Sequence, residues 1–190
     1  MVIAVTGKKR SGKNTLTSYL RNKYNFIEYA FAQPIKKLSY DLFDWNPEED
    51  EDLKECVDPR WGISRRQFWQ WFGTDAMQLA LGEYYADYKK ITGRNVWVKI
   101  FENFYEKNKD KNICISDFRF PHEEAYLRSI NAVTVKLIRK APDNKMDMHE
   151  SEMHIDSLIT DVTIYNDSNV ESLYTKVDNF MDILGGTQCI

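Results

Sequence analysis

A glycine-rich stretch near the N-terminus, residues 7–15, decides the fold, and it reads GKKRSGKNT. An apolar, β-branched run, VIAVT at residues 2–6, precedes this stretch, and Leu16, Tyr19 and Leu20 follow it at helical spacing. Such a run is typical of a buried parallel strand. The glycines therefore stand between a strand and a helix, which is the context that a phosphate-binding loop requires.

The chemistry of this stretch favours a nucleoside triphosphate with its metal ion. Glycines let the backbone curl so that successive N–H groups point at one anion, and the helix N-terminus adds the positive end of its dipole. Lys13 supplies a positive charge to the outer phosphates. We therefore expect ATP and Mg²⁺ to bind through Gly7, Arg10, Ser11, Gly12, Lys13, Asn14 and Thr15. An ordinary strand–turn–helix is the competing interpretation.

One position of the loop departs from the strict pattern. Asn14 stands where Ser or Thr usually offers a hydroxyl to Mg²⁺, and Thr15 comes one place later. The metal would then be held mostly by phosphates, waters and a distant carboxylate. This departure favours a kinase of small molecules over a GTPase or a motor protein.

Outside the loop, hydrophobic periodicity predicts strands and helices in alternation. Strands are expected at 26–31, 113–116, 132–138 and 161–165. Helices are expected from Lys13 to about Arg21, from Pro34 onward, from Ser64 to about Leu81, at 96–106, from Pro121 and at the C-terminus. This order predicts an α/β fold of three layers, with about five parallel strands flanked by helices. Ligands of such a sheet bind beyond the carboxyl ends of its strands.

Three finer expectations concern single segments. One broad face of the helix over 64–81 should carry Phe68, Trp71, Phe72 and Leu79. Ser168 and Glu171 have capping-box spacing, so Ser168 should precede the last helix. The acidic stretch 47–55, PEEDEDLKE, should be a solvated loop or the start of a helix.

Composition sets the class of protein. The chain has 190 residues, 43% of them hydrophobic, which fits a single domain with a real core. A net charge of −3 argues against a surface that binds polymeric nucleic acid. The N-terminal apolar run is too short for a signal peptide or a membrane span, and three distant cysteines favour free thiols. We therefore expect a cytoplasmic protein, without membrane attachment, that binds small nucleotides.

A kinase whose acceptor is itself phosphorylated needs a second cationic pocket, because two anions must be brought in line. Arginine suits this role, since its planar fork binds two phosphate oxygens at once. The candidate side chains are Lys36, Arg65, Arg66, Arg119 and Arg139. Any one of these cations could instead be a solvated surface residue. Asp117, at a strand end before Arg119, is a candidate for ordering metal or phosphate, with a helix cap as the alternative.

Taken together, these segments resemble the deoxynucleoside monophosphate kinases of phages and large viruses. The matching stretches are GKKRSGKNT at 7–15, YAFAQPIKKL at 29–38, SRRQFWQWFGTD at 64–75, NVWVKIF at 95–101, ISDFRFPHEEA at 115–125, AVTVKLIRK at 132–140 and the region from HESE at 149–152 to YND at 165–167. They cover nearly the whole chain in family order. The resemblance implies a compact nucleoside-monophosphate-kinase fold, with an acceptor-binding helical segment at about 33–108 and a short lid at about 139–153.

The resemblance also implies roles for single residues. Ser11, Lys13, Asn14 and Thr15 would lie on the ATP phosphates, and Arg139, at the start of the lid, is also expected to bind ATP. The monophosphate pocket would be lined by Lys36, Arg66, Gln70, Gly73, Thr74 and Trp97, and Arg65, a candidate cation beside Arg66, is expected to bind the substrate as well. Between the two nucleotides would lie Asp117, Arg119 and Glu123. The groups expected to act in the reaction are Lys13, Arg119, Asp117 and Arg66, and the metal would be ordered by Asp117 and Thr15 through phosphates and water.

Two departures from the family pattern stand out. The family typically has Asp where this chain has Asn14, which concerns the ligands of the metal. The spacer from Thr74 to Trp97 is long here, which concerns the base of the acceptor.

Other functions remain open at this point. HESEMH at 149–154 places two histidines five residues apart, whereas a zinc site on one helical face needs four. Another kinase of a phosphorylated metabolite, of the dephospho-coenzyme A or phosphomevalonate type, would share the loop. A regulator that binds nucleotide without phosphotransfer is the alternative from another class. The sequence leaves open the accepted bases and whether the chain is a monomer or a homodimer.

Overall fold

A computed structural model describes residues 1–139 and 154–186. Within it the chain forms two compact units, and each is described by itself. The sheet unit comprises Met1–Ala30 and Asn108–Ile190, and the helical unit comprises Phe31–Lys107. The bounds of the helical unit are close to those of the acceptor-binding segment expected at 33–108.

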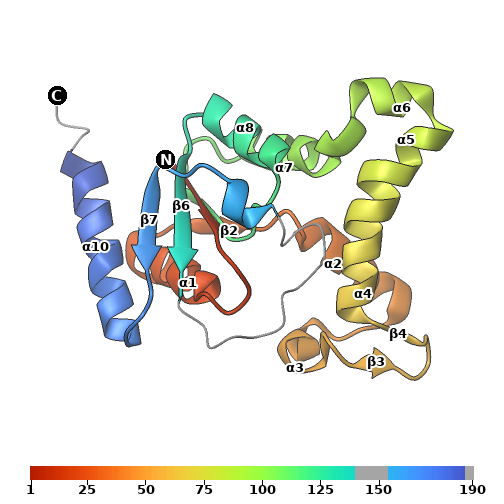
Figure 1. Cartoon of the computed structure of the whole chain (residues 1–190), viewed down its shortest axis with the longest axis horizontal. Helices are drawn as coiled ribbons and strands as arrows, with labels where there is room; N and C mark the ends of the chain where they lie inside the picture. Colours follow the sequence, from red (N-terminus) through yellow and green to blue (C-terminus); the bar gives the residue numbers. More distant parts are fainter. Residues whose placement is uncertain (140–153, 187–190) are drawn as a thin grey trace. The chain divides into compact units, whose positions relative to one another are not determined.

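The sheet unit is built on five parallel strands (Figure 1). They are β1 (Val2–Thr6), β2 (Ile27–Tyr29), β5 (Ile113–Ile115), β6 (Val133–Ile138) and β7 (Val162–Tyr165). The strand order is β2-β5-β1-β6-β7, so β1 lies in the centre, with Ile3 opposite Cys114 on one side and Val133 on the other. All five strands fall on segments that periodicity predicted, and the α/β fold with a five-stranded parallel sheet is confirmed.

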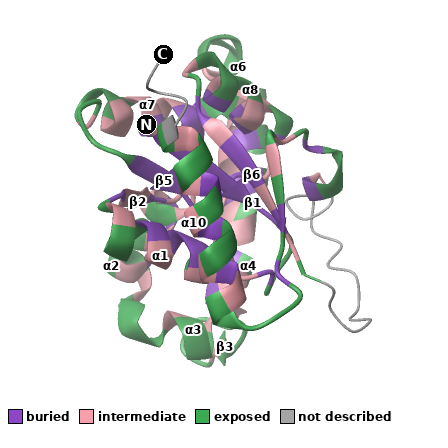
Figure 2. Ribbon diagram, turned by 90° about the vertical axis from the view of Figure 1, so that its left-hand side faces the viewer, coloured by how far each residue is buried: buried purple, intermediate pink, exposed green. Residues whose placement is uncertain are grey.

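Among the described residues of this unit, the α-helices that accompany the sheet are α1 (Lys13–Tyr24), α8 (Pro121–Ser129) and α10 (Val170–Gly186), and a short 3-10 turn, η4 (Ile155–Ser157), precedes β7. Helices α1 and α10 lie side by side over the sheet (Figure 2). Leu16 and Leu20 of α1 and Val177 of α10 pack with Ile3 and Val5 in one buried cluster. The helix that carries the phosphate loop is thus fixed to the sheet by the core itself.

The start of α10 differs from the prediction. Asn169 caps this helix, because its side-chain oxygen accepts a hydrogen bond of 2.9 Å from the backbone N–H of Ser172. The predicted capping box of Ser168 and Glu171 is therefore wrong by one residue. Asn is as good an N-cap as Ser, so spacing alone did not distinguish the two.

The helical unit is a chain of short helices with one hairpin. Its elements are α2 (Gln33–Phe43), η1 (Pro47–Glu49), α3 (Asp50–Leu53), the antiparallel pair β3 (Val57–Asp58) and β4 (Ile63–Ser64), α4 (Arg65–Gln70), η2 (Trp71–Ala80), α5 (Leu81–Tyr84), α6 (Ala86–Ile91), η3 (Gly93–Asn95) and α7 (Val96–Glu106). Aromatic rings form part of its core, with the ring centroid of Phe43 4.5 Å from that of Trp45 and 4.8 Å from that of Phe68.

The helix predicted over 64–81 is confirmed, but its register is not. A capping box of Ser64 and Gln67 begins it, and the segment Trp71–Ala80 is a π-helix. Because a π-helix takes more residues per turn than an α-helix, side chains rotate away from the face that a 3.6-residue period predicts. Trp71 and Leu79 are accordingly 56% and 41% exposed, whereas Gly73, Thr74 and Gln78 are buried.

No helix over residues 1–139 and 154–186 is long and apolar enough to cross a membrane. Of the three cysteines, Cys56 and Cys114 are free thiols, and Cys189 lies outside the described residues.

Candidate active site

The phosphate loop connects the end of β1 to the start of α1, as predicted. Gly12 has φ 101°, in the region that favours glycine, and a Cβ there would lie 2.5 Å from Nδ2 of Asn166. A Cβ on Gly7 would lie 2.7 Å from Oγ of Ser11. Both glycines are therefore required by close approach within the loop, and the curled backbone is the conformation that an anion-binding loop needs.

Lys13 and Ser11 supply the polar groups of the loop. The ammonium of Lys13 donates to the carbonyl oxygens of Gly7 at 2.5 Å and Lys8 at 2.9 Å, which holds the charge against the loop. Ser11 Oγ is buried and has no hydrogen-bond partner among the described residues, and the same holds for Oγ1 of Thr6. Buried hydroxyls without partners are rare in folded proteins. Such a group in a curled, cationic loop fits a bound phosphate.

The residues expected near the metal offer only oxygen donors. Asn14 is exposed and Thr15 half-buried in the first turn of α1. No group of three or more His, Cys, Asp or Glu side chains that could hold a metal occurs in the described part of the chain. Amide, hydroxyl and carboxylate oxygens suit Mg²⁺, which keeps several waters and binds substrate phosphates. The donor set thus fits a magnesium ion that arrives with its nucleotide.

Asn166 is a site residue that the sequence analysis did not single out. It follows β7, it is buried, and its Nδ2 donates to the carbonyl oxygen of Ser11 at 2.9 Å. Its backbone N–H donates to Ile138 at 2.7 Å, which fixes its position beyond the sheet. The strand-end rule could have found it, because Asn166 stands directly after the last strand.

A second polar segment, Asp117–Glu123, follows β5. Glu123 is buried, and its Oε2 accepts hydrogen bonds from the backbone N–H groups of Arg119 at 2.7 Å and Phe120 at 3.0 Å. Burial raises the pKa of Glu123 to about 8, and the nearby charge of Asp117 adds to this, although the two N–H bonds oppose it. Glu123 therefore shapes the turn from within, whereas Asp117 and Arg119 are half-buried on it.

The charge of Asp117 also reaches the neighbouring strand. Burial, and after it the negative charge of Asp117, raise the pKa of Tyr29 at the end of β2. The backbone N–H of Ser116 donates to the carbonyl oxygen of Tyr29 at 3.1 Å, so the ends of β2 and β5 are joined.

In the helical unit, Arg65 is held by acidic partners. Its side chain is 5% exposed and forms ion pairs with Asp50 at 2.6 Å and Glu49 at 3.1 Å. The carbonyl oxygen of Asn46 accepts a further bond at 2.7 Å. The prediction that the whole acidic stretch 47–55 is solvated is therefore wrong for Asp50, whose side chain is only 15% exposed. Two carboxylates of that stretch neutralise a buried guanidinium.

The other two candidate cations of this unit also have acidic partners. Lys36 Nζ lies 3.3 Å from Asp50 and 4.5 Å from the ring centroid of Trp69. Arg66 Nε lies 2.8 Å from Glu55, whose side chain is 48% exposed. A phosphate that binds Lys36 or Arg66 would thus meet a cation already positioned by a carboxylate.

Gly73 and Trp97 connect two helices of the same unit. The indole N–H of Trp97 donates to the carbonyl oxygen of Gly73 at 2.8 Å. A Cβ on Gly73 would lie 2.7 Å from Cδ1 of Ile35, so a larger residue would require the side chain of Ile35 to move. Thr74 is buried and Gln70 half-buried beside this contact. Trp97 is itself 5% exposed and packs in the core.

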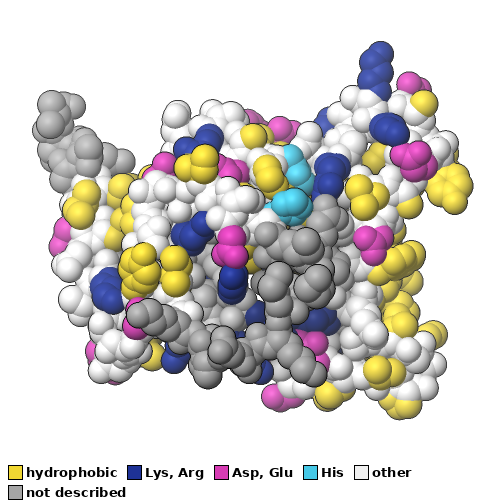
Figure 3. Space-filling model, viewed as in Figure 1, with side chains coloured by type: hydrophobic (Ala, Val, Ile, Leu, Met, Phe, Trp, Pro, Cys, Tyr) yellow, Lys and Arg dark blue, Asp and Glu magenta, His cyan; other side chains and the backbone are white. Residues whose placement is uncertain are grey.

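Most of the expected lid lies outside the described residues. Arg139, directly after β6, is exposed, and residues 140–153 are not described. The zinc interpretation falls there too, since His149, Glu150 and Glu152 lie outside the described part. The ring centroid of Phe120 lies 5.8 Å from that of His154 and 5.3 Å from that of His122, on which it stacks. Histidine side chains are visible on the face of the molecule that Figure 3 shows.

The structure therefore brings one group of predicted residues to one edge of the sheet. The phosphate loop, the Asp117–Glu123 segment and Arg139 follow β1, β5 and β6, and Asn166 follows β7. Because these strands are parallel, their carboxyl ends share one edge. The predicted acceptor residues Lys36, Arg65, Arg66, Gln70, Gly73, Thr74 and Trp97 all belong to the helical unit.

Comparison with known proteins agrees with this arrangement. A protein of Acanthamoeba polyphaga mimivirus, provisionally named a deoxynucleotide monophosphate kinase, is 29% identical, with 96% of each chain covered. The deoxynucleotide monophosphate kinase of Escherichia phage RB69 is 22% identical, with 95% of this chain and 99% of the phage protein covered. The shikimate kinase from Aquifex aeolicus superposes with a TM-score of 0.53 at 15% identity over the whole of both chains, which shows the fold alone.

A family profile gives the assignment. The profile described as "Deoxynucleotide monophosphate kinase" matches residues 1–57 and 46–177, which together include the phosphate loop, the candidate acceptor residues, the Asp117–Glu123 segment and Asn166. On this match over most of its length, the chain belongs to the deoxynucleotide monophosphate kinase family.

Proposed function

We propose that the protein transfers the γ-phosphate of ATP to a deoxynucleoside 5′-monophosphate and releases ADP and a deoxynucleoside diphosphate. The family membership gives the class of reaction. The observation that carries the donor side is the phosphate loop, in which Lys13 is held at the carbonyl oxygens and the hydroxyl of Ser11 has no partner in the described part of the chain.

The chemistry needs little covalent participation by the protein. A phosphate oxygen of the acceptor attacks the γ-phosphorus, and the bond from that phosphorus to the bridging oxygen of ADP breaks. The electron pair leaves with ADP, and no proton has to move, because the acceptor phosphate has unprotonated oxygens near pH 7. Catalysis therefore consists of positioning the two phosphates and stabilising the charge that develops between them.

Different side chains bind the donor, the transferring phosphoryl group and the acceptor. Lys13 contacts the outer phosphates of ATP, and Arg119 stabilises the phosphoryl group during transfer. Arg66 and Lys36 bind the acceptor phosphate, while Arg65 holds the acidic stretch in place through Asp50. An Mg²⁺ ion bound with ATP would neutralise part of the charge of the phosphates. Asp117, Thr15 and Asn14 would hold that ion through phosphates and waters.

Deoxyribose is the sugar that the family name implies, and we propose that it is preferred over ribose. A pocket packed against C2′ would leave a 2′-hydroxyl crowded or without a hydrogen-bond partner. The measurement is kcat/KM for dGMP against GMP, and equal values would contradict the preference.

The function is tested by coupled ADP release with each deoxynucleoside and ribonucleoside monophosphate as acceptor. Dephospho-coenzyme A and phosphomevalonate are included, because a kinase of either metabolite would share the loop. We expect turnover only with deoxynucleoside monophosphates. Tight ATP binding without ADP release for any acceptor would instead indicate a regulator.

A further inference from the structure

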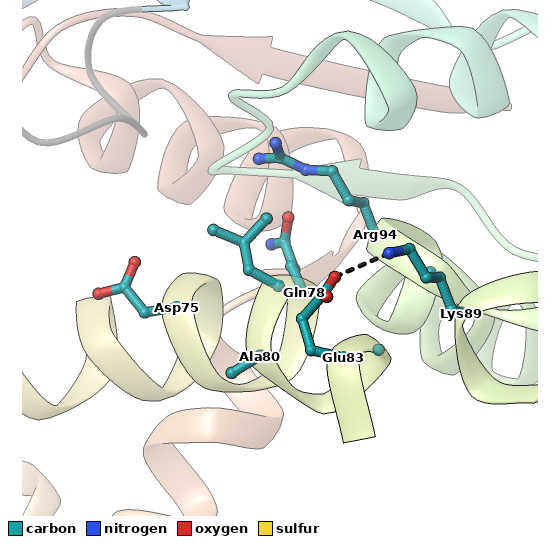
Figure 4. Close-up of a pocket in the computed structure, with 9 residues that line it drawn as sticks. Asp75, Gln78, Ala80, Glu83, Lys89 and Arg94 are labelled. Atoms are coloured by element: carbon teal, nitrogen blue, oxygen red, sulfur yellow. Dashed lines mark hydrogen bonds and ion pairs between the residues drawn. The ribbon is translucent and has the colours of Figure 1, made fainter. Parts of the chain in front are cut away.

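The long spacer between Thr74 and Trp97 has a structure of its own. It comprises the end of η2, the helices α5 and α6, and the short turn η3. A cavity of about 380 Å³ opens within this spacer, with all of its lining residues between Asp75 and Arg94 (Figure 4). That volume is within the range of pockets that bind small ligands. The sequence departure noted at this place thus corresponds to a pocket.

The cavity contains a buried polar group, the amide of Gln78. Gln78 is 5% exposed, it lines the cavity, and its Oε1 is buried without a hydrogen-bond partner among the described residues. The side chains of Gln78 and Arg94 extend from η2 and η3 into the same space (Figure 4). An unpaired buried amide oxygen costs about 1–3 kcal/mol. A ligand that donates a hydrogen bond to Gln78 would remove that cost.

The position of Gln78 relates the cavity to the acceptor. Gly73, Thr74 and Gln78 are the buried residues of η2, so they share one side of the helix. Gln78 lies four residues beyond Thr74, which is about one turn of this π-helix, so the two residues are neighbours along its buried side. One helical turn is the scale of the separation between the parts of one nucleotide. A ligand near Gly73 and Thr74 would therefore extend into the cavity.

From these observations we propose that residues 75–94 form the pocket for the base of the acceptor, with Gln78 as a residue that determines base preference. The proposal rests on the proposed function, because it assumes that a deoxynucleoside monophosphate binds at Gly73 and Thr74. An amide offers one acceptor and one donor side by side, and each nucleobase has an edge with adjacent donor and acceptor groups. Rotation of the Gln78 amide by half a turn exchanges its donor and its acceptor, so it can pair with a base edge that presents donor and acceptor in either order.

The other lining groups suit a planar polar ring. Glu83 and Lys89 neutralise each other through an ion pair of 2.7 Å, so the rim carries little net charge (Figure 4). Leu79, which is 41% exposed, lines the cavity with an apolar surface. A base can therefore lie against apolar surface while its edge faces Gln78.

Two substitutions test this assignment in opposite directions. Gln78→Leu keeps the size of the side chain and removes both polar groups, so the edge of the base loses its partners. We expect kcat/KM for the deoxynucleoside monophosphates to fall about 10- to 100-fold, as buried donors left unpaired require. Gln78→Glu presents acceptors only, which favours guanine, with two adjacent donors, over thymine, whose N–H is flanked by acceptors. The ratio of kcat/KM for dGMP to that for dTMP should then rise about tenfold or more.

The controls separate this proposal from the proposed function. Asn103→Leu removes an exposed amide from α7 of the same unit. It should change neither kcat/KM for the deoxynucleoside monophosphates nor the ratio of kcat/KM for dGMP to that for dTMP. Ala80→Phe, which fills the cavity from an exposed position of η2, should raise KM for every acceptor and covers the case in which the Gln78 variants do not fold. Acceptor binding is also measured by calorimetry without ATP.

The outcomes are distinct. No turnover of any deoxynucleoside monophosphate by the unchanged protein contradicts the proposed function. Turnover by the unchanged protein, together with folded Gln78 variants that keep its acceptor affinities and its dGMP-to-dTMP ratio, overturns the base pocket alone. Unchanged acceptor KM values in Ala80→Phe overturn it as well.

Discussion

The carboxyl of Glu123 gives the sharpest prediction for stability. Its Oε2 alone accepts both backbone hydrogen bonds, from Arg119 and Phe120. A glutamine oxygen can accept the same two bonds, so Glu123→Gln keeps the geometry of the turn and removes only the titration. The variant therefore isolates the free energy of ionising a buried carboxyl.

The sign follows from the raised pKa of Glu123, about 8 against an ordinary value of 4.5. Below pH 4.5 the carboxyl is protonated in the folded and the unfolded chain. Between pH 4.5 and 8 the unfolded chain loses this proton and the folded chain keeps it, so folding stability falls as pH rises. The free energy of unfolding then falls by about 1.4 kcal/mol per pH unit. Between pH 5 and 8 the total loss from Glu123 is roughly 4 kcal/mol as an upper value.

The assay is urea unfolding of the unchanged protein and of Glu123→Gln at several pH values between 5 and 8. The other titrating groups, the histidines included, are present in both proteins and cancel in the difference. We expect the unchanged protein to lose at least about 1 kcal/mol relative to the variant across this range, measured as a shift of the urea midpoint. A difference that stays constant from pH 5 to 8 would refute the reasoning, because Glu123 would then be ionised in the folded protein.

Three further predictions concern the site. Asn166→Ala should raise KM for ATP several-fold and lower stability by about 1–3 kcal/mol, because it leaves a buried carbonyl oxygen of the loop unpaired; the matched control Asn169→Ala should cost only about 1 kcal/mol through its helix cap, with KM for ATP unchanged. Arg66→Ala should raise KM for the monophosphate much more than KM for ATP, and equal effects on both would remove Arg66 from the acceptor pocket. Asn14→Asp should stay active and lower the Mg²⁺ concentration for half-maximal rate, and Asp117→Asn should be less damaging in that background; an equal cost in both backgrounds would show that the two positions do not share the metal.

The sequence predicts the parts of this protein that depend on local patterns. The loop at 7–15 and the five strands are recognisable because glycine spacing and apolar runs act within a few residues. The partner of the loop, Asn166, lies 155 residues from Ser11 and has no local signal beyond its place after a strand. Contacts of that length come from the packing of the sheet.

In the helical unit, too, contacts between distant residues cannot be predicted from local sequence patterns. Arg65 has the sequence signature of a phosphate-binding arginine, but its charge is neutralised by Asp50, 15 residues earlier in the chain. The π-helix of Trp71–Ala80 likewise changes which side chains are buried, and a fixed period of 3.6 residues cannot anticipate it. In the sequence Gln78 is therefore an ordinary polar residue, and only its burial and the cavity beside it distinguish it.

One measurement tests the central claim most directly, namely ADP release by the unchanged protein and by Lys13→Ala, with ATP, Mg²⁺ and each deoxynucleoside monophosphate. The account predicts turnover that depends on the monophosphate, and a folded Lys13→Ala variant that loses most of it, because the charge of Lys13 acts chiefly on the transferring phosphates. A folded Lys13→Ala variant with a rate within a few-fold of the unchanged protein would contradict the account.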